Sequence, residues 1–196
     1  MTVVDVGADI GYYAVQFAEL VGPKGKVIAF EPTSDGRRIL AANAILNDYA
    51  HLHIHPEALS DRNGVVHFGV SKVKSQMTLA HQEKVTDSSR PETVRMIQFD
   101  EWAPQHQVDT VDLVKVDVEG AELLVLSGMS DLLKRCRPIL VIEVHPKMMP
   151  TFNANHEALF KYLKGFRYDS PDLVYGRIGD NATETYQVIC GQSEHP

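Results

Sequence analysis

The chain has 196 residues, of which 44% are hydrophobic and 23% are charged, and this composition predicts one globular domain, spanning residues 1–196, with a sizeable core. Its formal net charge of −7 argues against nucleic acid as a partner, and no apolar run is long enough to span a membrane. The first residues lack the layout of a secretion signal and the 2 cysteines form no Cys-x-x-Cys pair, so we expect a cytoplasmic protein with free thiols.

The chain opens on a buried strand, a glycine turn and a helix. Residues 2–6 are apolar apart from Asp5 and Thr2, and residues 12–20 have the spacing of a helix. Gly7 permits a turn too tight for a side chain, and Gly11 permits the helix to lie close to the strand or to a ligand. Because parallel α/β sheets hold nucleotide-like ligands at such a turn, the opening predicts a ligand site.

The spacing of the glycines indicates which ligand fits. A dinucleotide motif that starts at Gly7 requires glycine at two positions where this chain has Asp9 and Tyr12, and the phosphate loop that ends in Gly-Lys-Ser/Thr is absent. A carboxylate at Asp5 repels a pyrophosphate but suits a cationic amino group. S-adenosylmethionine carries an ammonium and a sulfonium and no phosphate, so we favour it. A turn that binds no ligand is the alternative.

A second strand is predicted over residues 26–30, and it ends at Glu31 and Pro32. An acidic residue at this position, roughly 20 residues beyond the glycine turn, is placed to accept hydrogen bonds from ribose hydroxyls. We therefore expect Glu31 to bind ribose, although a lone glutamate after a strand is more often a solvated loop residue.

Three histidines alternate along the next predicted strand. A helix is predicted over residues 35–47 and this strand over residues 51–55, so His51, His53 and His55 face one side. Histidine is a common metal ligand, but three side chains along one strand span too much length to close around one ion easily. We interpret the histidines as a polar sheet edge and assign no metal ligand.

The rest of the chain alternates strands and helices, which is the pattern of a parallel sheet with helices on both faces. Further strands are predicted over residues 65–70, 93–99, 111–117, 138–144, 166–168 and 186–190, the last two as a closing antiparallel pair. Further helices are predicted over residues 121–133 and 157–163, and the polar stretch 71–91 is predicted to be a loop.

Three carboxylates cluster where the strand over residues 111–117 meets the next helix. Strand carboxyl ends line the ligand crevice of such sheets, so we expect Asp117 to face the same cleft as Asp5. Glu122 lies in the first helical turn, where a carboxylate favours the helix dipole, and this explains it without a function. The negative charges of Asp117 and Glu119 repel each other, so placing them together costs free energy unless a cation or a proton lies nearby. The alternative interpretation is that both are solvated loop residues without a function.

Glu143 and His145 belong to the end of the strand over residues 138–144, which we expect beside the strand that carries Asp117. Crowded carboxylates have raised pKa values, so this group is a candidate for a general base. It can equally bind a divalent cation, or form structural salt bridges with Lys115 or Lys147. The sequence does not separate these three interpretations.

Taken together, these segments resemble the FkbM-type family of S-adenosylmethionine-dependent methyltransferases. The similarity is most specific in the Lys-x-Asp-x-Glu-Gly-x-Glu stretch that begins at Lys115. The matching segments, in chain order, are residues 4–13, 30–32, 58–61, 113–128 and 142–144. The resemblance implies an α/β, Rossmann-like class I methyltransferase fold. Its seven-stranded, mostly parallel sheet has the order 3-2-1-4-5-7-6, helices on both faces and a closing antiparallel strand.

The resemblance also implies which residues contact S-adenosylmethionine. The implied contacts are with the methionine half by Asp5, Gly7 and Gly11, with Tyr12 and Tyr13 nearby, with the ribose by Glu31, with the adenine by Glu57 and Ala58, and with the sulfonium by Asp117. Ala8, Asp9, Pro32 and Leu59 are further expected cofactor-binding residues. The chain departs from the family at Asp9, where asparagine is usual. Because the first strand is predicted at residue 2, we also expect the chain to lack the N-terminal cap from which family members often build part of the acceptor pocket, either as a naturally minimal form or through loss of the cap.

The reaction that the resemblance implies is methyl transfer to a hydroxyl oxygen of a sugar or a natural-product-like small molecule. The candidate catalytic residues are Asp117, Glu119, Glu143 and His145, and the last three are candidates for the base that takes the hydroxyl proton. A nicotinamide-dependent oxidoreductase and a non-catalytic cofactor-binding module are the alternatives. Neither the acceptor nor the oligomeric state can be predicted from the sequence.

Overall fold

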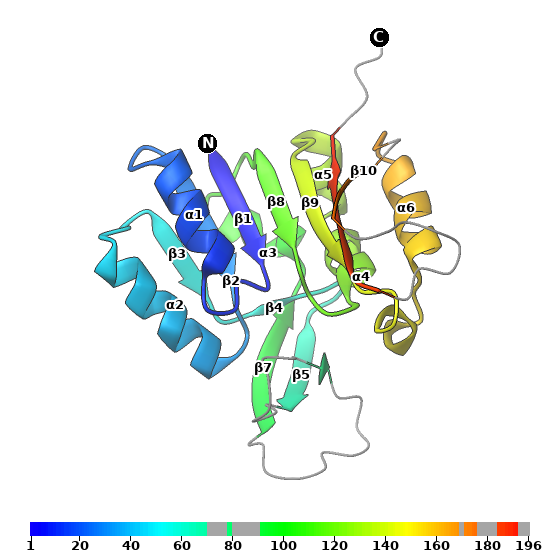
Figure 1. Ribbon diagram of the computed structural model, residues 1–196, viewed down its shortest axis with the longest axis horizontal. Helices are drawn as coiled ribbons and strands as arrows, with labels where there is room; N and C mark the ends of the chain where they lie inside the picture. The colour runs from blue at the N-terminus through cyan, green and yellow to red at the C-terminus, as the bar shows by residue number, and fades with distance from the viewer. Residues whose placement is uncertain (70–77, 80–90, 169–170, 176–183, 192–196) are drawn as a thin grey trace.

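A seven-stranded sheet forms the centre of the protein in its computed structural model, which describes residues 1–69, 78–79, 91–168, 171–175 and 184–191 (Figure 1). The strands follow the order β10-β11-β9-β8-β1-β2-β3, and β11 runs antiparallel to both of its neighbours whereas the other pairs are parallel. This confirms the predicted strand order. The bounds are β1 Thr2–Val6, β2 Lys26–Phe30, β3 Leu52–His55, β8 Leu113–Val116, β9 Ile139–Val144, β10 Asp172–Tyr175 and β11 Tyr186–Cys190.

Helices cover both faces of the sheet, as predicted. Successive strand residues point to opposite faces, so Val3 packs on the side of α1 and α2, whereas Val4 packs on the side of the later helices. The bounds are α1 Tyr12–Val21, α2 Ser34–Leu46, α3 Phe99–Gln105, α4 Glu122–Ser127, α5 Ser130–Arg135, the 3₁₀ helix η1 Met149–Phe152 and α6 His156–Lys164. None of the helices in the described ranges has the length and apolar character that a membrane span requires.

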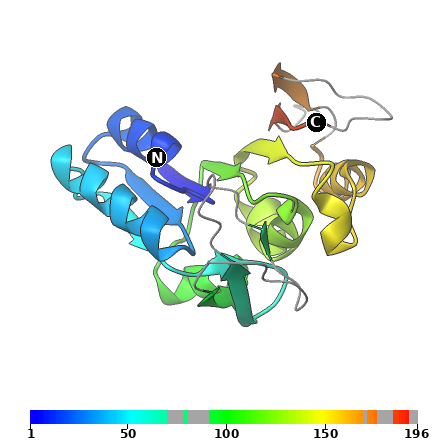
Figure 2. The ribbon, with the colours of Figure 1, turned by 60° about the horizontal axis from the view of Figure 1, so that its bottom comes forward.

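A second, smaller sheet lies beyond the carboxyl ends of the central strands, where Figure 1 shows β5 and β7 projecting from the body. Figure 2 brings this end of the molecule forward. The strands of this second sheet follow the order β4-β7-β5-β6. Their bounds are β4 Ala58–Leu59, β5 Gly64–Gly69, β6 Thr78–Leu79 and β7 Pro91–Ile97. Two of these strands were predicted, but their pairing as a separate sheet was not. Most of the loop predicted over 71–91 lies outside the described residues.

The single helix predicted over residues 121–133 is wrong, because the chain forms α4 and α5 with a break at Gly128 and Met129. A Cβ atom on Gly128 would lie 1.9 Å from the carbonyl oxygen of Ser60, so the backbone of another segment fills this position. Asp100 then caps the second helix, since its two oxygens accept hydrogen bonds from the amides of Asp131 and Leu132 at 2.8 and 3.0 Å. The close contact of Gly128 with Ser60 and the cap formed by Asp100 both join residues that are far apart in the sequence.

Two strand predictions also need correction. Residues 166–168 form a turn after α6 rather than a strand, and the hydroxyl of Tyr168 donates a hydrogen bond to Pro138 O at 2.7 Å. The strand that pairs with β11 is β10 instead. Phe99 was placed in a strand but begins α3, and its ring is fully buried in the core. Aromatic residues favour strands, but Phe99 begins a helix because its ring packs into the core from that position.

Candidate active site

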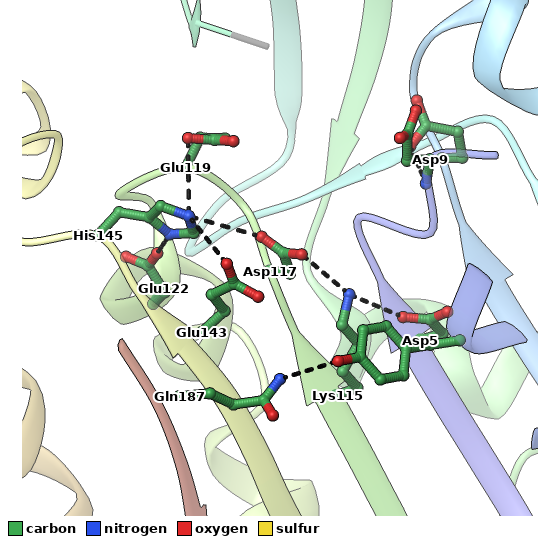
Figure 3. A network of polar contacts seen from close by, with 11 residues as sticks. Asp5, Asp9, Lys115, Asp117, Glu119, Glu122, Glu143, His145 and Gln187 are labelled. Atoms are coloured by element: carbon green, nitrogen blue, oxygen red, sulfur yellow. Dashed lines mark hydrogen bonds and ion pairs between the residues drawn. The ribbon is translucent and has the colours of Figure 1, made fainter. Parts of the chain in front are cut away.

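The carboxyl ends of β1, β8 and β9 lie side by side in the middle of the sheet, and each carries polar side chains. The register places Asp5 of β1 opposite Lys115 of β8, and Asp117 follows directly after β8. Glu143 lies in β9 and His145 follows it. Figure 3 shows these side chains pointing toward one another, so the predicted meeting of the two acidic segments is what the structure contains.

Lys115 joins the first two carboxylates. Its ammonium lies 3.6 Å from Asp5 Oδ1 and 3.2 Å from Asp117 Oδ2, and it lies 4.8 Å from the centre of the Tyr13 ring (Figure 3). Burial lowers the pKa of Lys115, but the two carboxylates outweigh burial and hold the pKa above its usual range. Lys115 is therefore a buried ammonium that lies between the two carboxylates, and the salt bridge expected for Lys115 forms with Asp117 rather than Glu143.

Asp5 is completely buried, and neither of its carboxylate oxygens accepts a hydrogen bond of ordinary length from the described residues. Burial raises the pKa of Asp5, and the positive charge of Lys115 opposes this only in part. A buried carboxylate with unused acceptor capacity favours a nearby cation or hydrogen-bond donor.

The two glycines of the first turn have different structural roles. Gly7 has φ 79°, and a Cβ atom there would lie 1.9 Å from the backbone oxygen of Asp117, so the turn after β1 touches the turn after β8. Gly11 has φ 93°, and its Cβ would lie 2.4 Å from the Leu40 side chain. Gly11 is thus explained by the packing of α1 against α2, whereas Gly7 fixes the two acidic turns against each other.

Glu31 already accepts hydrogen bonds from its own surroundings. Its Oε2 accepts from the Asp9 amide at 2.8 Å, and its Oε1 accepts from the Thr33 amide at 2.8 Å and from the Thr33 hydroxyl. Glu31 has no exposed surface, and burial raises its pKa. Asp9 adopts φ 47°, which is uncommon for a residue other than glycine. Glu31 therefore ties the glycine turn to the end of β2, and its Oε2, which accepts only the Asp9 amide hydrogen among these three, keeps one acceptor position for a ribose hydroxyl.

The second acidic group surrounds His145. Its Nε2 lies 3.8 Å from Asp117 Oδ1, 3.7 Å from Glu119 Oε2 and 3.8 Å from Glu143 Oε1, which is beyond hydrogen-bond distance in each case (Figure 3). Glu119 adopts φ 52°, so strained backbone directs its side chain here. Three of the predicted catalytic carboxylates thus converge on one imidazole nitrogen.

Glu122 was explained from the sequence by the helix dipole, but the structure gives it a further role. It has no exposed surface, and its Oε1 accepts hydrogen bonds from the Gly120 amide at 3.0 Å and from His145 Nδ1 at 2.8 Å. Its other oxygen and the hydroxyl of Tyr186 are buried without a hydrogen-bond partner in the described residues. Burial and the charge of Glu122 raise the pKa of Tyr186 to about 12. No sequence pattern around Glu122 indicated its hydrogen bond with His145.

The acidic surroundings shift the protonation of the site. Burial acts to lower the pKa of His145, but its hydrogen bond to Glu122 and the charges of Glu122 and Glu119 outweigh burial and raise the pKa. Burial raises the pKa of Glu119, and His145 opposes this in part. The site therefore holds more negative charge than its own two cationic groups, Lys115 and His145, can balance.

The remaining predicted cofactor residues lie around this group. Ala8 and Pro32 are buried, and Tyr12 is 69% exposed at the start of α1. Ala58 and Leu59 form β4, and the Oε2 atom of Glu57 is buried with no hydrogen-bond partner among the residues that the structure describes. Sequence reasoning missed Gln187 of β11, whose amide donates a hydrogen bond to the Tyr13 hydroxyl at 3.4 Å.

The three histidines of the edge strand do not gather around one point. His51 Nε2 lies 2.8 Å from Ala18 O, His53 is exposed, and the His55 ring packs 4.7 Å from the Trp102 ring. β3 is the last strand of the central sheet, in agreement with a polar sheet edge. Among the described residues, the three-residue set whose ligand atoms lie within 4.8 Å of one another is Asp117, Glu143 and His145. Cys136 and Cys190 are both free.

The strand order, the glycine turn after β1 and the acidic strand ends together define a class I methyltransferase fold. The methyltransferase FkbM domain model matches residues 5–170, and the chain belongs to this family. The FkbM methyltransferase structure from Methylobacillus flagellatus superposes with a TM-score of 0.63 at 17% identity, over 96% of this chain and 43% of that one.

Two curated relatives support the family assignment. The chain is 32% identical over 148 residues to the hexuronic acid methyltransferase AglP of Haloferax volcanii, covering 74% of this chain and 56% of AglP. It is 24% identical over 148 residues to the 2-O-methyltransferase NoeI of Sinorhizobium fredii, covering 69% of this chain and 60% of NoeI. The matched region is thus little more than half the length of each relative.

Proposed function

We propose that the protein transfers the methyl group of S-adenosylmethionine to a hydroxyl oxygen of a sugar or a similar small molecule. The observation that carries the proposal is the convergence of Asp5, Asp117, Glu119, Glu143 and His145 at adjoining strand ends. Family membership supports the methyl transfer, and the names of the relatives AglP and NoeI support a sugar-like acceptor.

The residues present fit S-adenosylmethionine at the methionine end. Asp5 is buried with two carboxylate oxygens that accept no hydrogen bond of ordinary length from the described part of the chain, and it lies in the strand before the glycine turn. A cationic amino group is a suitable partner for such a carboxylate. Asp5, Gly7 and Tyr13 would hold the methionine half, Glu31 the ribose, and Glu57 with Ala58 and Leu59 the adenine. When bound, S-adenosylmethionine supplies an electrophilic methyl group on its sulfonium.

The chain's own contribution to the reaction is to place the acceptor and to take its proton. A neutral hydroxyl is a poor nucleophile, so a base within hydrogen-bond reach raises the rate by about 10² to 10⁴. Glu119, Glu143 and His145 are the candidates, because they surround one point and Glu119 and His145 have raised pKa values. Holding the acceptor oxygen at near-attack distance supplies a further part of the acceleration.

The test is calorimetric titration of S-adenosylmethionine and S-adenosylhomocysteine into the full chain, the Asp5→Asn and Glu31→Gln variants, and the matched control Asp48→Asn. Asp48 is exposed and lies between α2 and β3, away from the strand ends that carry the site. Its variant should therefore bind like the unchanged chain. We expect binding that weakens by about tenfold or more in the two site variants. Equal binding by all variants would contradict the placement, and absence of binding by the unchanged chain would contradict the cofactor.

A second experiment addresses the acceptor. The full chain is incubated with radiolabelled S-adenosylmethionine and a panel of hexuronic acids, neutral sugars and simple alcohols, and methyl incorporation is counted. We expect incorporation into at least one sugar hydroxyl and a loss of turnover in Glu143→Gln and His145→Ala. Binding of a reduced nicotinamide in place of S-adenosylmethionine would favour an oxidoreductase. Cofactor binding without incorporation into any acceptor would favour a non-catalytic module.

A further inference from the structure

The imidazole of His145 directs one nitrogen at a group of carboxylates. His145 is only 6% exposed, and three carboxylate oxygens surround its Nε2 at ion-pair distances of 3.7 to 3.8 Å, which is beyond hydrogen-bond reach. Spacings this long leave room for an atom between the nitrogen and the oxygens.

The other nitrogen of His145 fixes how the ring is used. Its Nδ1 lies 2.8 Å from Glu122 Oε1, and that oxygen is already an acceptor because it takes the Gly120 amide hydrogen. Nδ1 therefore donates its hydrogen to Glu122, and in the neutral ring the lone pair of Nε2 points at the cluster. A histidine that donates its far N–H to a buried carboxylate is the arrangement that orients metal-ligating histidines in proteins.

The spacing suits one ion. Two ligand atoms that each lie about 2.1 Å from one cation are about 3.0 Å apart at octahedral angles and about 3.4 Å apart at tetrahedral angles. The Nε2 distances of 3.8 Å to Asp117 Oδ1 and Glu143 Oε1 require a contraction of about 0.4 Å for tetrahedral and about 0.8 Å for octahedral angles. All three ligand atoms lie within 4.8 Å of one another, so side-chain rotation would have to bring them together around an ion. Lys115 holds the other oxygen of Asp117 at 3.2 Å, so Oδ1 remains available as a ligand.

The charges point the same way. Five carboxylates, those of Asp5, Asp117, Glu119, Glu122 and Glu143, meet one permanent cation, Lys115, and one histidine. Even a protonated His145 leaves this group with excess negative charge in a half-buried site. A divalent cation bound by a neutral His145 would remove about half of this excess, whereas a water molecule would remove none.

We propose that Asp117, Glu143 and His145 bind one divalent first-row metal cation, which the acceptor hydroxyl approaches from the open side. The inference rests on the proposed function for its role, since a bound cation would act there as a Lewis acid that makes the hydroxyl easier to deprotonate. With Glu143 and His145 as ligands of the cation, Glu119 is the group left to take the proton. The cation site itself stands on the geometry of the three ligands. Two carboxylates with one imidazole fit Mn²⁺, because Mg²⁺ prefers oxygen ligands alone and softer metals prefer more nitrogen or sulfur.

The experiment measures Mn²⁺ binding by electron paramagnetic resonance, with the chelator-treated full chain and without S-adenosylmethionine. We expect one Mn²⁺ per chain, and an affinity reduced by about tenfold or more in Glu143→Gln and His145→Gln. Glu122→Ala should also weaken binding by about 10- to 100-fold, because His145 loses the carboxylate that orients it. The matched control is Glu157→Gln, which removes an exposed carboxylate of α6 and should leave the affinity unchanged.

The outcomes separate this inference from the proposed function. Mn²⁺ binding that the ligand variants weaken supports the site even if S-adenosylmethionine does not bind. Absence of Mn²⁺ binding up to millimolar concentration, or equal loss in Glu157→Gln, overturns it even if methyl transfer is confirmed. Circular dichroism and the urea midpoint of each variant show that it is folded. If His145→Gln fails to fold, Glu143→Gln and Asp117→Asn decide by the same criterion.

Discussion

Gly7 offers the sharpest test of how the candidate site is held together. Substituting Gly7→Ala places a Cβ atom 1.9 Å from the backbone oxygen of Asp117, where no rotation of a side chain can relieve the contact. The residue also has φ 79°, which costs an alanine about 1–2 kcal/mol. Overpacking adds about 1–3 kcal/mol, so we expect a loss of about 2–5 kcal/mol in the free energy of unfolding. For a chain of this size the expected fall in Tm is about 4 to 20 °C.

Two other glycines allow the backbone strain and the steric contact to be measured separately. Gly22 has φ 64° and ψ −177° but nothing within 4 Å of its Cβ position, so Gly22→Ala measures backbone strain without a contact. Gly128 has φ −77°, and its Cβ would lie 1.9 Å from Ser60 O, so Gly128→Ala measures a contact without strain. Urea unfolding at 25 °C compares the three variants, and the loss in Gly7→Ala should approach the sum of the other two. A Gly7→Ala loss below about 1 kcal/mol, or below both controls, would refute the reasoning.

Three further changes should also be measurable by urea unfolding. Lys115→Met leaves Asp5 buried without a counter-ion and should cost about 3–5 kcal/mol, whereas Lys134→Met, at an exposed ion pair, should cost less than about 1 kcal/mol; equal losses would contradict the buried pair. Asp100→Ala removes the cap of α5 and should cost about 1 kcal/mol, with its effect confined to stability. Asn155→Ala should cost a similar amount, because its side chain accepts the amide hydrogen of the third residue of α6; a neutral result would mean that this cap is frayed in solution.

Local sequence patterns were sufficient for the central sheet. The apolar runs at residues 2–6 and 26–30 became strands buried on both faces, because such strands need apolar side chains in succession. The run at 138–144 became a strand with one buried face and one partly exposed face. The Asp117 and Glu143 positions followed from the rule that parallel strands end at one edge. Their meeting could be predicted because it depends on strand order alone.

Contacts between distant segments decided the parts that the sequence did not predict. The break at Gly128 is caused by the backbone of Ser60, and the fixed position of His145 is caused by Glu122. Neither partner is recognisable from spacing, because each pair joins two segments whose relative placement only the complete fold determines. The hydrogen bonds that close Glu31 have the same origin, since the Asp9 amide reaches it only through a left-handed turn.

The pairing of β1 with β8 also constrains the order in which the protein can fold as it is synthesised. Thr2 of β1 and Asp112, which are bonded at the beginning of this pair, are 110 positions apart in the chain. At about 5–20 residues per second, β1 leaves the ribosome several seconds before its central partner exists. During this interval Asp5 has no counter-ion and must stay hydrated, so the candidate site closes only after more than half of the chain has emerged.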